Sequence, residues 1–261
     1  MDTFRKAYTQ RCKEVLSAYG FQRKGKVFVR VVQDIVQTLS YEKLPSGRKR
    51  RIRVMFSVMP LCLRIEKWYL DGCYYRELRE FEIAQGNDEY SCFLYDSKSE
   101  DSMNDCVEEI VRYLKEYLIP FFEKANNSHN ALRELIQVDE LFHTNRITEG
   151  RLAGWKVNEE LVKECNLRDN VICHLALKNE NYALALRCRQ VQEKDSQHAM
   201  ENRLMYGLLT EEEKSQWEKE LAILHEENQR LAAGDVTYFK QILSENEAYS
   251  KKVLEEMKIK L

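Results

Sequence analysis

Tyr19-Gly20-Phe21-Gln22-Arg23-Lys24-Gly25-Lys26-Val27-Phe28-Val29-Arg30 is the stretch of this 261-residue chain that decides its fold. Before it, from Phe4 to Ala18, apolar side chains recur near helical spacing, and Gly20 follows as a helix stop. From Lys26 to Val32, valines occupy alternate positions, which is typical of a strand. The stretch therefore predicts a helix that is followed directly by a β-sheet.

The residues that follow continue the strand pattern. Gln33-Asp34 predicts a turn into a second strand from Ile35 to Tyr41, and alternating apolar positions from Ile52 to Val58 predict a third strand. Weaker strand patterns cover residues 78–83 and 90–95. Because short connections favour pairing between neighbours in sequence, these segments predict a small antiparallel sheet.

From about Ser102 the apolar period changes to that of a helix, which extends to Lys115, and Pro120 is expected to end or kink it. Further helical patterns cover residues 130–142, 159–165, 169–178, 182–191, 197–208, 210–232 and 235–257. The predicted class is therefore α+β. Residues 1–150 form a domain with a small antiparallel sheet packed by helices, and residues 151–261 form an all-helical domain.

The cysteine pattern and the apolar runs indicate the compartment. The chain has eight cysteines without a Cys-x-x-Cys pair, and it opens Met1-Asp2-Thr3-Phe4 without an apolar signal stretch. Its longest apolar run, residues 117–122, is too short to span a bilayer. We therefore expect reduced thiols, a cytoplasmic protein and no membrane association.

No nucleophile motif, metal-ligand spacing or phosphate loop is present. Asp139-Glu140 and His143 share one helical turn, which is compatible with acid–base chemistry and equally with a surface hydrogen bond. We therefore expect no catalytic residues, no metal and no cofactor. An enzyme without a recognisable motif stays open as an alternative.

The basic residues are concentrated near the start of the chain. Residues 1–53 contain 14 Lys and Arg against 4 Asp and Glu, a net charge of +10. One interpretation is an anion-binding face that contacts nucleic acid, and the other is that oppositely charged surfaces offset each other in the fold. The candidate anion-binding residues are Lys24, Lys26, Arg48, Lys49, Arg50, Arg51 and Arg53.

A cluster of aromatic residues surrounds Asp71-Gly72. Tyrosine and tryptophan combine apolar area with a polar group, so they are suited to lining a groove. The alternative is that they cover one end of the sheet. The candidate groove aromatics are Trp68, Tyr69, Tyr74 and Tyr75.

The last two predicted helices carry an interaction seam with heptad spacing, made of Trp217, Leu221, Leu224, Asn228 and Leu231. We expect it to pack within the chain, as an antiparallel hairpin, against the stripe Phe239, Ile242, Leu243, Tyr249 and Val253. Asn246 is then the expected polar partner of Asn228. A dimer seam is the alternative, so the chain is expected to be a monomer or a weak dimer.

Three segments together carry a resemblance to a known family: Gly20 to Phe28 after the first helix, Thr38-Leu39-Ser40-Tyr41-Glu42-Lys43, and Leu118-Ile119-Pro120-Phe121-Phe122-Glu123-Lys124. Over roughly residues 4–140 the chain resembles the bacterial domain of unknown function 4304 family. The resemblance implies a small antiparallel sheet packed by helices and a bacterial, cytoplasmic origin, and it supplies no catalytic residues. The basic run from Arg48 to Arg53 departs from the family pattern.

These observations favour a non-catalytic protein-binding or accessory module. Neutralisation of a toxin is one form of such a function, by analogy with other small bacterial proteins. Nucleic-acid binding through the basic turn is the alternative. A protein partner whose binding survives nuclease treatment distinguishes the first function from the second.

Overall fold

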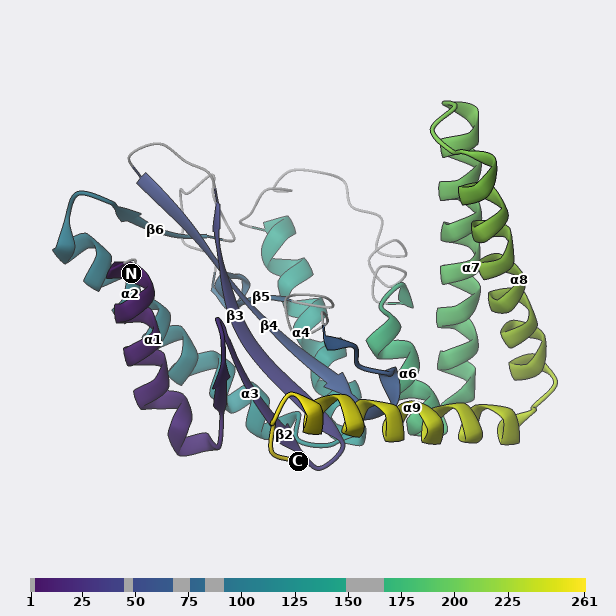
Figure 1. Cartoon of the computed structure of the whole chain (residues 1–261), viewed down its shortest axis with the longest axis horizontal. Helices are drawn as coiled ribbons and strands as arrows, with labels where there is room; N and C mark the ends of the chain where they lie inside the picture. Colours follow the sequence, from purple (N-terminus) through teal and green to yellow (C-terminus); the bar gives the residue numbers. More distant parts are fainter. Residues whose placement is uncertain (1–2, 45–48, 68–75, 83–91, 149–166) are drawn as a thin grey trace.

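The computed structural model describes residues 3–44, 49–67, 76–82, 92–148 and 167–261 (Figure 1). Within these residues the chain is an α+β protein with a six-stranded antiparallel sheet, packed by helices and followed by a helical C-terminal region. The predicted fold class is therefore confirmed. No helix of the described residues is long and apolar enough to cross a membrane.

The first helix and the first hairpin form as the opening stretch predicts. Helix α1 (Thr3–Leu16) continues into a 3-10 turn (Ser17–Tyr19), where Gly20 adopts a left-handed φ of 79°. Glycine adopts this conformation without steric cost, so the chain reverses here. Strands β1 (Gln22–Lys24) and β2 (Val27–Val32) follow and pair with each other.

Two long strands form the centre of the sheet. They are β3 (Ile35–Leu44) and β4 (Lys49–Pro60), and the sheet order is β1-β2-β3-β4-β5. Strand β5 (Arg76–Glu77) pairs with the middle of β4, and β6 (Phe93–Asp96) pairs with its start. The weak strand pattern over 78–83 is wrong, because Leu78–Phe81 form a 3-10 helix, η4.

One face of the sheet is covered by α1 and by the helices that follow β6. These are α2 (Glu100–Tyr113), α3 (Ile119–Lys124) and α4 (Ser128–Thr148). The ring of Phe56 on β4 contacts Phe121 of α3 and Phe142 of α4, each with a centroid distance near 6 Å (5.6 and 6.3 Å). Aromatic packing therefore fixes these helices on the sheet.

A π-helical turn, η5 (Leu114–Leu118), joins α2 to α3. Pro120 has no N–H with which to continue the α-helical hydrogen bonds. Instead the Ile119 N–H donates to the Leu114 carbonyl, five residues earlier, and the helix then resumes as α3. The predicted interruption at Pro120 is thus a change of helical register.

The C-terminal region consists of α6 (Asn170–Lys178), α7 (Tyr182–Met205), α8 (Glu211–Ala232) and α9 (Val236–Glu256). The separate helices predicted over 182–191 and 197–208 are one continuous helix, α7. The helix predicted over 159–165 lies outside the described residues. Buried residues of α6 and α9 belong to the same hydrophobic core as the sheet. The proposed domain boundary near residue 150 also lies outside the described residues and stays a prediction.

The expected packing of the interaction seam on α9 is wrong, because α8 packs antiparallel to α7. Asn228 donates to the carboxylate of Glu193 on α7, whereas Asn246 donates to the Cys62 carbonyl at 3.2 Å. Helix α9 turns away at Gly234, which has a left-handed φ of 74°. It crosses the base of α7 and α8 and packs on Leu61–Leu63 instead (Figure 1). Short loops connect α8 both to α7 and to α9, so the length of a loop does not show which of these two helices packs on α8.

Candidate functional site

Helices α7 and α8 project from the body as a two-helix arm (Figure 1). The buried residues of these helices all lie at its base: Ala185 and Cys188 on α7, and Asn228 and Leu231 on α8. Residues 189–227 are all described, and none of them is buried. We call residues 189–227 the arm. A segment of this length that contributes no buried side chain adds little to the core, which directs attention to its surface.

Polar contacts hold the two helices of the arm together. The indole N–H of Trp217 donates to the Ser196 hydroxyl at 2.7 Å, and Arg189 forms an ion pair with Glu227 at 3.0 Å. The Glu193 carboxylate contacts His225 at 2.8 Å. These contacts specify how α7 and α8 pair, and nearer the tip the Arg203 guanidinium of α7 also lies over the Trp217 ring of α8.

The far end of the arm displays a patch of apolar side chains. Over the described residues, eight large hydrophobic side chains are exposed, and four of them lie within five consecutive positions. We call these four, Leu204, Met205, Tyr206 and Leu208, the tip patch. Three of them are about two-thirds exposed: Met205 at 67%, Tyr206 at 70% and Leu208 at 66%. Single exposed apolar residues are ordinary, whereas a large contiguous cluster of them would be a candidate interaction site.

The backbone under the tip patch is held firmly at both helix ends. Gly207, with a φ of 63°, donates to the Leu204 carbonyl at 3.0 Å, and Leu208 donates to the Arg203 carbonyl at 2.8 Å. These two bonds form the usual glycine-based helix end. Helix α8 then begins with a capping box between Thr210 and Glu213. The backbone that carries the tip patch is therefore held by hydrogen bonds at both helix ends, which lowers the entropic cost of binding.

Acidic residues flank the tip patch in the sequence, together with the basic residues Arg203 and Lys214. Glu211, Glu212 and Glu213 occupy the first turn of α8, and Glu201 is exposed in the last turns of α7. Beside them is a hollow of about 390 Å³, in which the Arg203 guanidinium lies 5.6 Å from the Trp217 ring centre. An apolar patch with an acidic rim fits a protein surface that offers an apolar pocket with basic groups at its edge.

The structure does not gather the predicted anion-binding residues into one site. Lys24 and Lys26 lie at the β1–β2 hairpin, and two strands separate them from the basic start of β4. Lys24 donates to the Lys258 carbonyl at 2.7 Å, and Arg53 pairs with Glu77 at 3.1 Å. Successive strand residues point to opposite faces, so Lys49, Arg51 and Arg53 share one face and Arg50 lies on the other. Arg48 and the predicted groove aromatics lie outside the described residues.

A second hollow, of about 470 Å³, lies between the end of α6 and α9. Lys178, Lys240 and Lys251 line it, together with Glu180 and Glu247. Each lysine forms an ion pair within 3 Å: Lys178 and Lys251 with Glu247, and Lys240 with Glu180. Two of these ion pairs, Lys178 with Glu247 and Lys240 with Glu180, therefore link the end of α6 to α9 across this hollow.

The acid–base interpretation of Asp139 is not supported, because a buried arginine engages this carboxylate. Arg76 donates to both oxygens of Asp139, at 2.6 and 2.7 Å, and also to Asp169 at 2.9 Å. The arginine side chain is 8% exposed, and Asp169 also caps α6. This cluster ties β5 to α4 and α6. No group of three or more metal-binding side chains occurs within the described residues.

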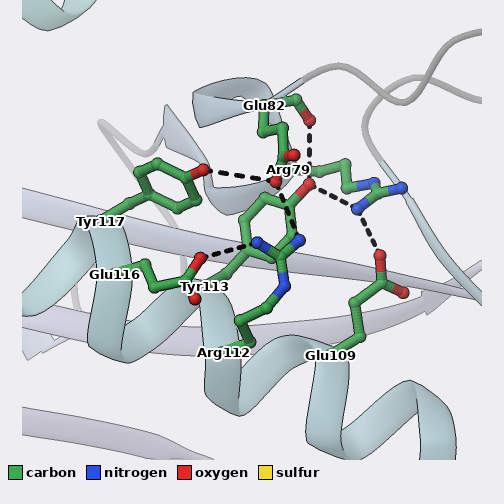
Figure 2. Close-up of polar contacts among 7 residues, drawn as sticks. All are labelled: Arg79, Glu82, Glu109, Arg112, Tyr113, Glu116 and Tyr117. Atoms are coloured by element: carbon green, nitrogen blue, oxygen red, sulfur yellow. Dashed lines mark hydrogen bonds and ion pairs between the residues drawn. The ribbon is translucent and has the colours of Figure 1, made fainter.

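A connected cluster of polar side chains lies between η4 and α2 (Figure 2). The Tyr113 hydroxyl accepts from Arg79 at 2.5 Å and donates to the Glu82 carbonyl at 2.9 Å. Arg79 also pairs with Glu109, and Arg112 bridges Glu82 and Glu116. Both arginines in the cluster therefore have carboxylate partners within the protein.

The electrostatics of this cluster favour a structural role. Burial raises the pKa of Tyr113 well above its usual value, so its phenol stays protonated at neutral pH. The hydrogen bond from Arg112 lowers the pKa of Glu82, which keeps that carboxyl ionised. Groups locked in these protonation states are poor proton-transfer catalysts near neutrality. The cluster clamps η4 onto α2.

A comparison with models of known protein families, with curated proteins and with solved structures finds no match to this chain. The resemblance to the bacterial domain of unknown function 4304 family therefore stays a prediction.

Sequence reasoning identified the seam of the arm and missed its tip. The run Leu204-Met205-Tyr206-Gly207-Leu208-Leu209 contains the available signal, because it is apolar where a helix ends at a glycine. Apolar residues beside a helix end usually fold back onto that helix. The exposure of Leu208 became evident only from the structure.

Proposed function

We propose that this protein is a non-catalytic protein-binding module that docks a partner through the tip patch. The observation that carries the proposal is the concentration of four exposed apolar side chains at the end of a projecting arm. The acidic rim further defines the partner as a protein whose apolar pocket is bordered by lysine or arginine. Toxin neutralisation is one function of this kind.

Two further features support a binding role. Both helix ends at the tip are capped, so the patch is preorganised. Aromatic and methionine side chains are enriched at the centres of protein interfaces, and the tip patch contains Tyr206 and Met205. We also propose a cytoplasmic setting. The six cysteines in the described part of the chain, all free and buried thiols, support it.

The proposal is tested by affinity capture with a matched control. The tagged protein, the triple variant Met205→Ser/Tyr206→Ser/Leu208→Ser and the single variant Ile223→Ser are each incubated with nuclease-treated extract of the source organism. Ile223 is a suitable control because it is an exposed apolar residue on the same arm, away from the tip, at 56% exposure. We expect the same partner with the parent and with Ile223→Ser, and its loss with the triple variant. Equal capture by all three proteins contradicts the proposal.

A further inference from the structure

Helices α6 and α7 form a hairpin at the base of the arm (Figure 1), and two cysteines meet across it. Cys173 of α6 and Cys188 of α7 are both free thiols without exposed surface. The Cys173 thiol donates to the Ala185 carbonyl at 3.9 Å. Cys188 follows Ala185 by one helical turn and so lies on the same face of α7. The two thiols form a hydrogen bond with each other.

Two other buried thiols have oxygen atoms as partners. Cys12 forms a hydrogen bond with the Tyr8 hydroxyl, and the Cys62 thiol donates to the His174 carbonyl at 3.9 Å. An oxygen partner cannot form a disulfide. Two thiols within hydrogen-bond distance, by contrast, need only a small movement to bring their sulfur atoms to bonding distance. The Cys173–Cys188 pair is therefore placed for covalent bond formation.

The two thiols of the pair differ in acidity. The hydrogen bond from the Cys188 thiol lowers the pKa of Cys173 against the effect of burial, and the charge of Arg189 acts in the same direction. The same hydrogen bond, together with burial, raises the pKa of Cys188. The thiolate is the form of cysteine that attacks an oxidant. Cys173 is therefore suited to attack, and Cys188 to complete the bond.

Little buried surface holds α7 at this place. Ala185 and Cys188 are its two buried residues, and Ala183 and Arg187, on the opposite face of the helix, are exposed. Because few buried contacts fix this end of α7, local opening of the α6–α7 hairpin costs less free energy than unfolding of the body. A small oxidant can reach both sulfur atoms in the open state.

We propose that Cys173 and Cys188 are a redox-active pair that hydrogen peroxide converts to a disulfide. The Cys173 thiolate attacks one peroxide oxygen, the O–O bond breaks, and the leaving hydroxide takes up the proton that Cys173 released, which forms water. Cys173 is then a sulfenic acid. The Cys188 sulfur attacks the Cys173 sulfur, the S–O bond breaks, and the leaving hydroxide takes the Cys188 proton as a second water. The two sulfur atoms together lose two electrons, which the peroxide gains.

The disulfide ties the base of α7 to α6, and buried residues of α6 belong to the same core as the sheet. A covalent link across the hairpin restrains its opening, because the open state loses conformational freedom. The reduced pair leaves the base of the arm free to open, and the oxidised pair closes it. The pair lies at the base of the arm, so this proposal does not depend on docking through the tip patch.

Peptide mapping of the full-length protein after a brief exposure to hydrogen peroxide tests the proposal, with free thiols alkylated before digestion. Trypsin cuts after Lys178 and Arg187, so Cys173 and Cys188 fall in separate peptides that only a disulfide joins. We expect these linked peptides as the first oxidation product and their separation by dithiothreitol. The other buried cysteines should be alkylated as in the unexposed protein.

Two variants and one further measurement complete the test. Cys188→Ser should form no such disulfide, whereas Cys106→Ser, the matched control that replaces a buried cysteine on α2, should form it as the parent does. In the oxidised parent, amide exchange over residues 171–188 should slow about tenfold. If Cys188→Ser does not fold, the peptide map of the parent decides.

Three results would overturn the proposal. The first is a parent that yields no linked peptides, or that links a different pair of cysteines first. The second is loss of the linkage in Cys106→Ser as well. The third is an oxidised parent whose amide exchange over residues 171–188 is unchanged, because the disulfide would then not restrain the hairpin.

Discussion

The indole N–H of Trp217 donates a 2.7 Å hydrogen bond to the Ser196 hydroxyl, and this bond joins the two helices of the arm between its base and its tip. Both side chains are only half-buried. The pairing of α7 with α8 therefore combines specific polar contacts with a seam of partly buried residues that includes Leu221 and Leu224. An arm of this kind is expected to be less stable than the body that carries it.

Removal of either partner of this hydrogen bond should weaken the arm. We expect Trp217→Phe and Ser196→Ala each to reduce the local free energy of opening by about 1 kcal/mol. The double variant should lose less than the sum of the two, because both changes remove one interaction. Amide hydrogen exchange over α7 and α8 measures the effect. Strict additivity would show that the two side chains do not interact in solution.

The cluster around Arg76 should be the most sensitive polar site of the body. Asp139→Asn leaves a buried guanidinium with a weaker partner, and we expect a loss of about 3 kcal/mol in the free energy of unfolding. Glu140→Gln is the control, since this neighbouring side chain is exposed. Urea unfolding of both variants provides the comparison. A loss below about 1 kcal/mol in Asp139→Asn would show that Asp169 alone satisfies Arg76.

His174 should make stability dependent on pH. Burial lowers the pKa of His174 to about 4, from a usual value of 6.5. Between these values the unfolded chain takes up a proton that the folded chain does not, so stability is lost as pH falls from about 6.5 to about 4. The expected contribution is about 3 kcal/mol. Unfolding of the parent and of His174→Leu across this range measures it.

The control for this prediction is His198→Gln, which alters an exposed histidine and should retain the pH dependence of the parent. In His174→Leu the decline between pH 6.5 and 4 should be reduced by about the predicted contribution. If all three proteins lose stability in parallel, the carboxylates are responsible and not His174.

Glu180 should tolerate replacement by glycine with a gain in stability. It ends α6 with a left-handed φ of 57°, a conformation that glycine adopts without strain. Its ion pair with Lys240 is exposed and contributes little. We expect Glu180→Gly to raise the free energy of unfolding by about 1 kcal/mol. Glu180→Ala, which keeps the strain, should not do so, and thermal unfolding distinguishes the two variants.

The sequence predicted those parts of the fold that local patterns control. Gly20 marks the end of the first helix, and Gln33-Asp34 forms the turn between two strands, because both depend on backbone conformation close in sequence. Pro120 was correctly identified as an interruption, although the π-helical solution depends on how the surrounding turns pack. The segment over 78–83 was mistaken for a strand because short apolar patterns do not distinguish a strand from a short helix.

The sequence could not determine which helices pair, or which apolar residues stay exposed. The seam on α8 was recognised from its spacing, but α7 and α9 are both close in sequence, and polar contacts such as Asn228 with Glu193 decided the partner. Leu208 has the same apolar character as a buried leucine, and only the direction of the arm leaves it in solvent. Tertiary arrangement therefore determines the tip patch.

Photo-crosslinking in living cells tests the central claim most directly. A photoreactive phenylalanine analogue replaces Tyr206 in one strain and Ile223 in another, and adducts are identified after irradiation. We expect a discrete adduct with one protein from position 206 and none from position 223, because only the former lies in the tip patch. The absence of any adduct from position 206, or the same adduct from both positions, would contradict docking through the tip.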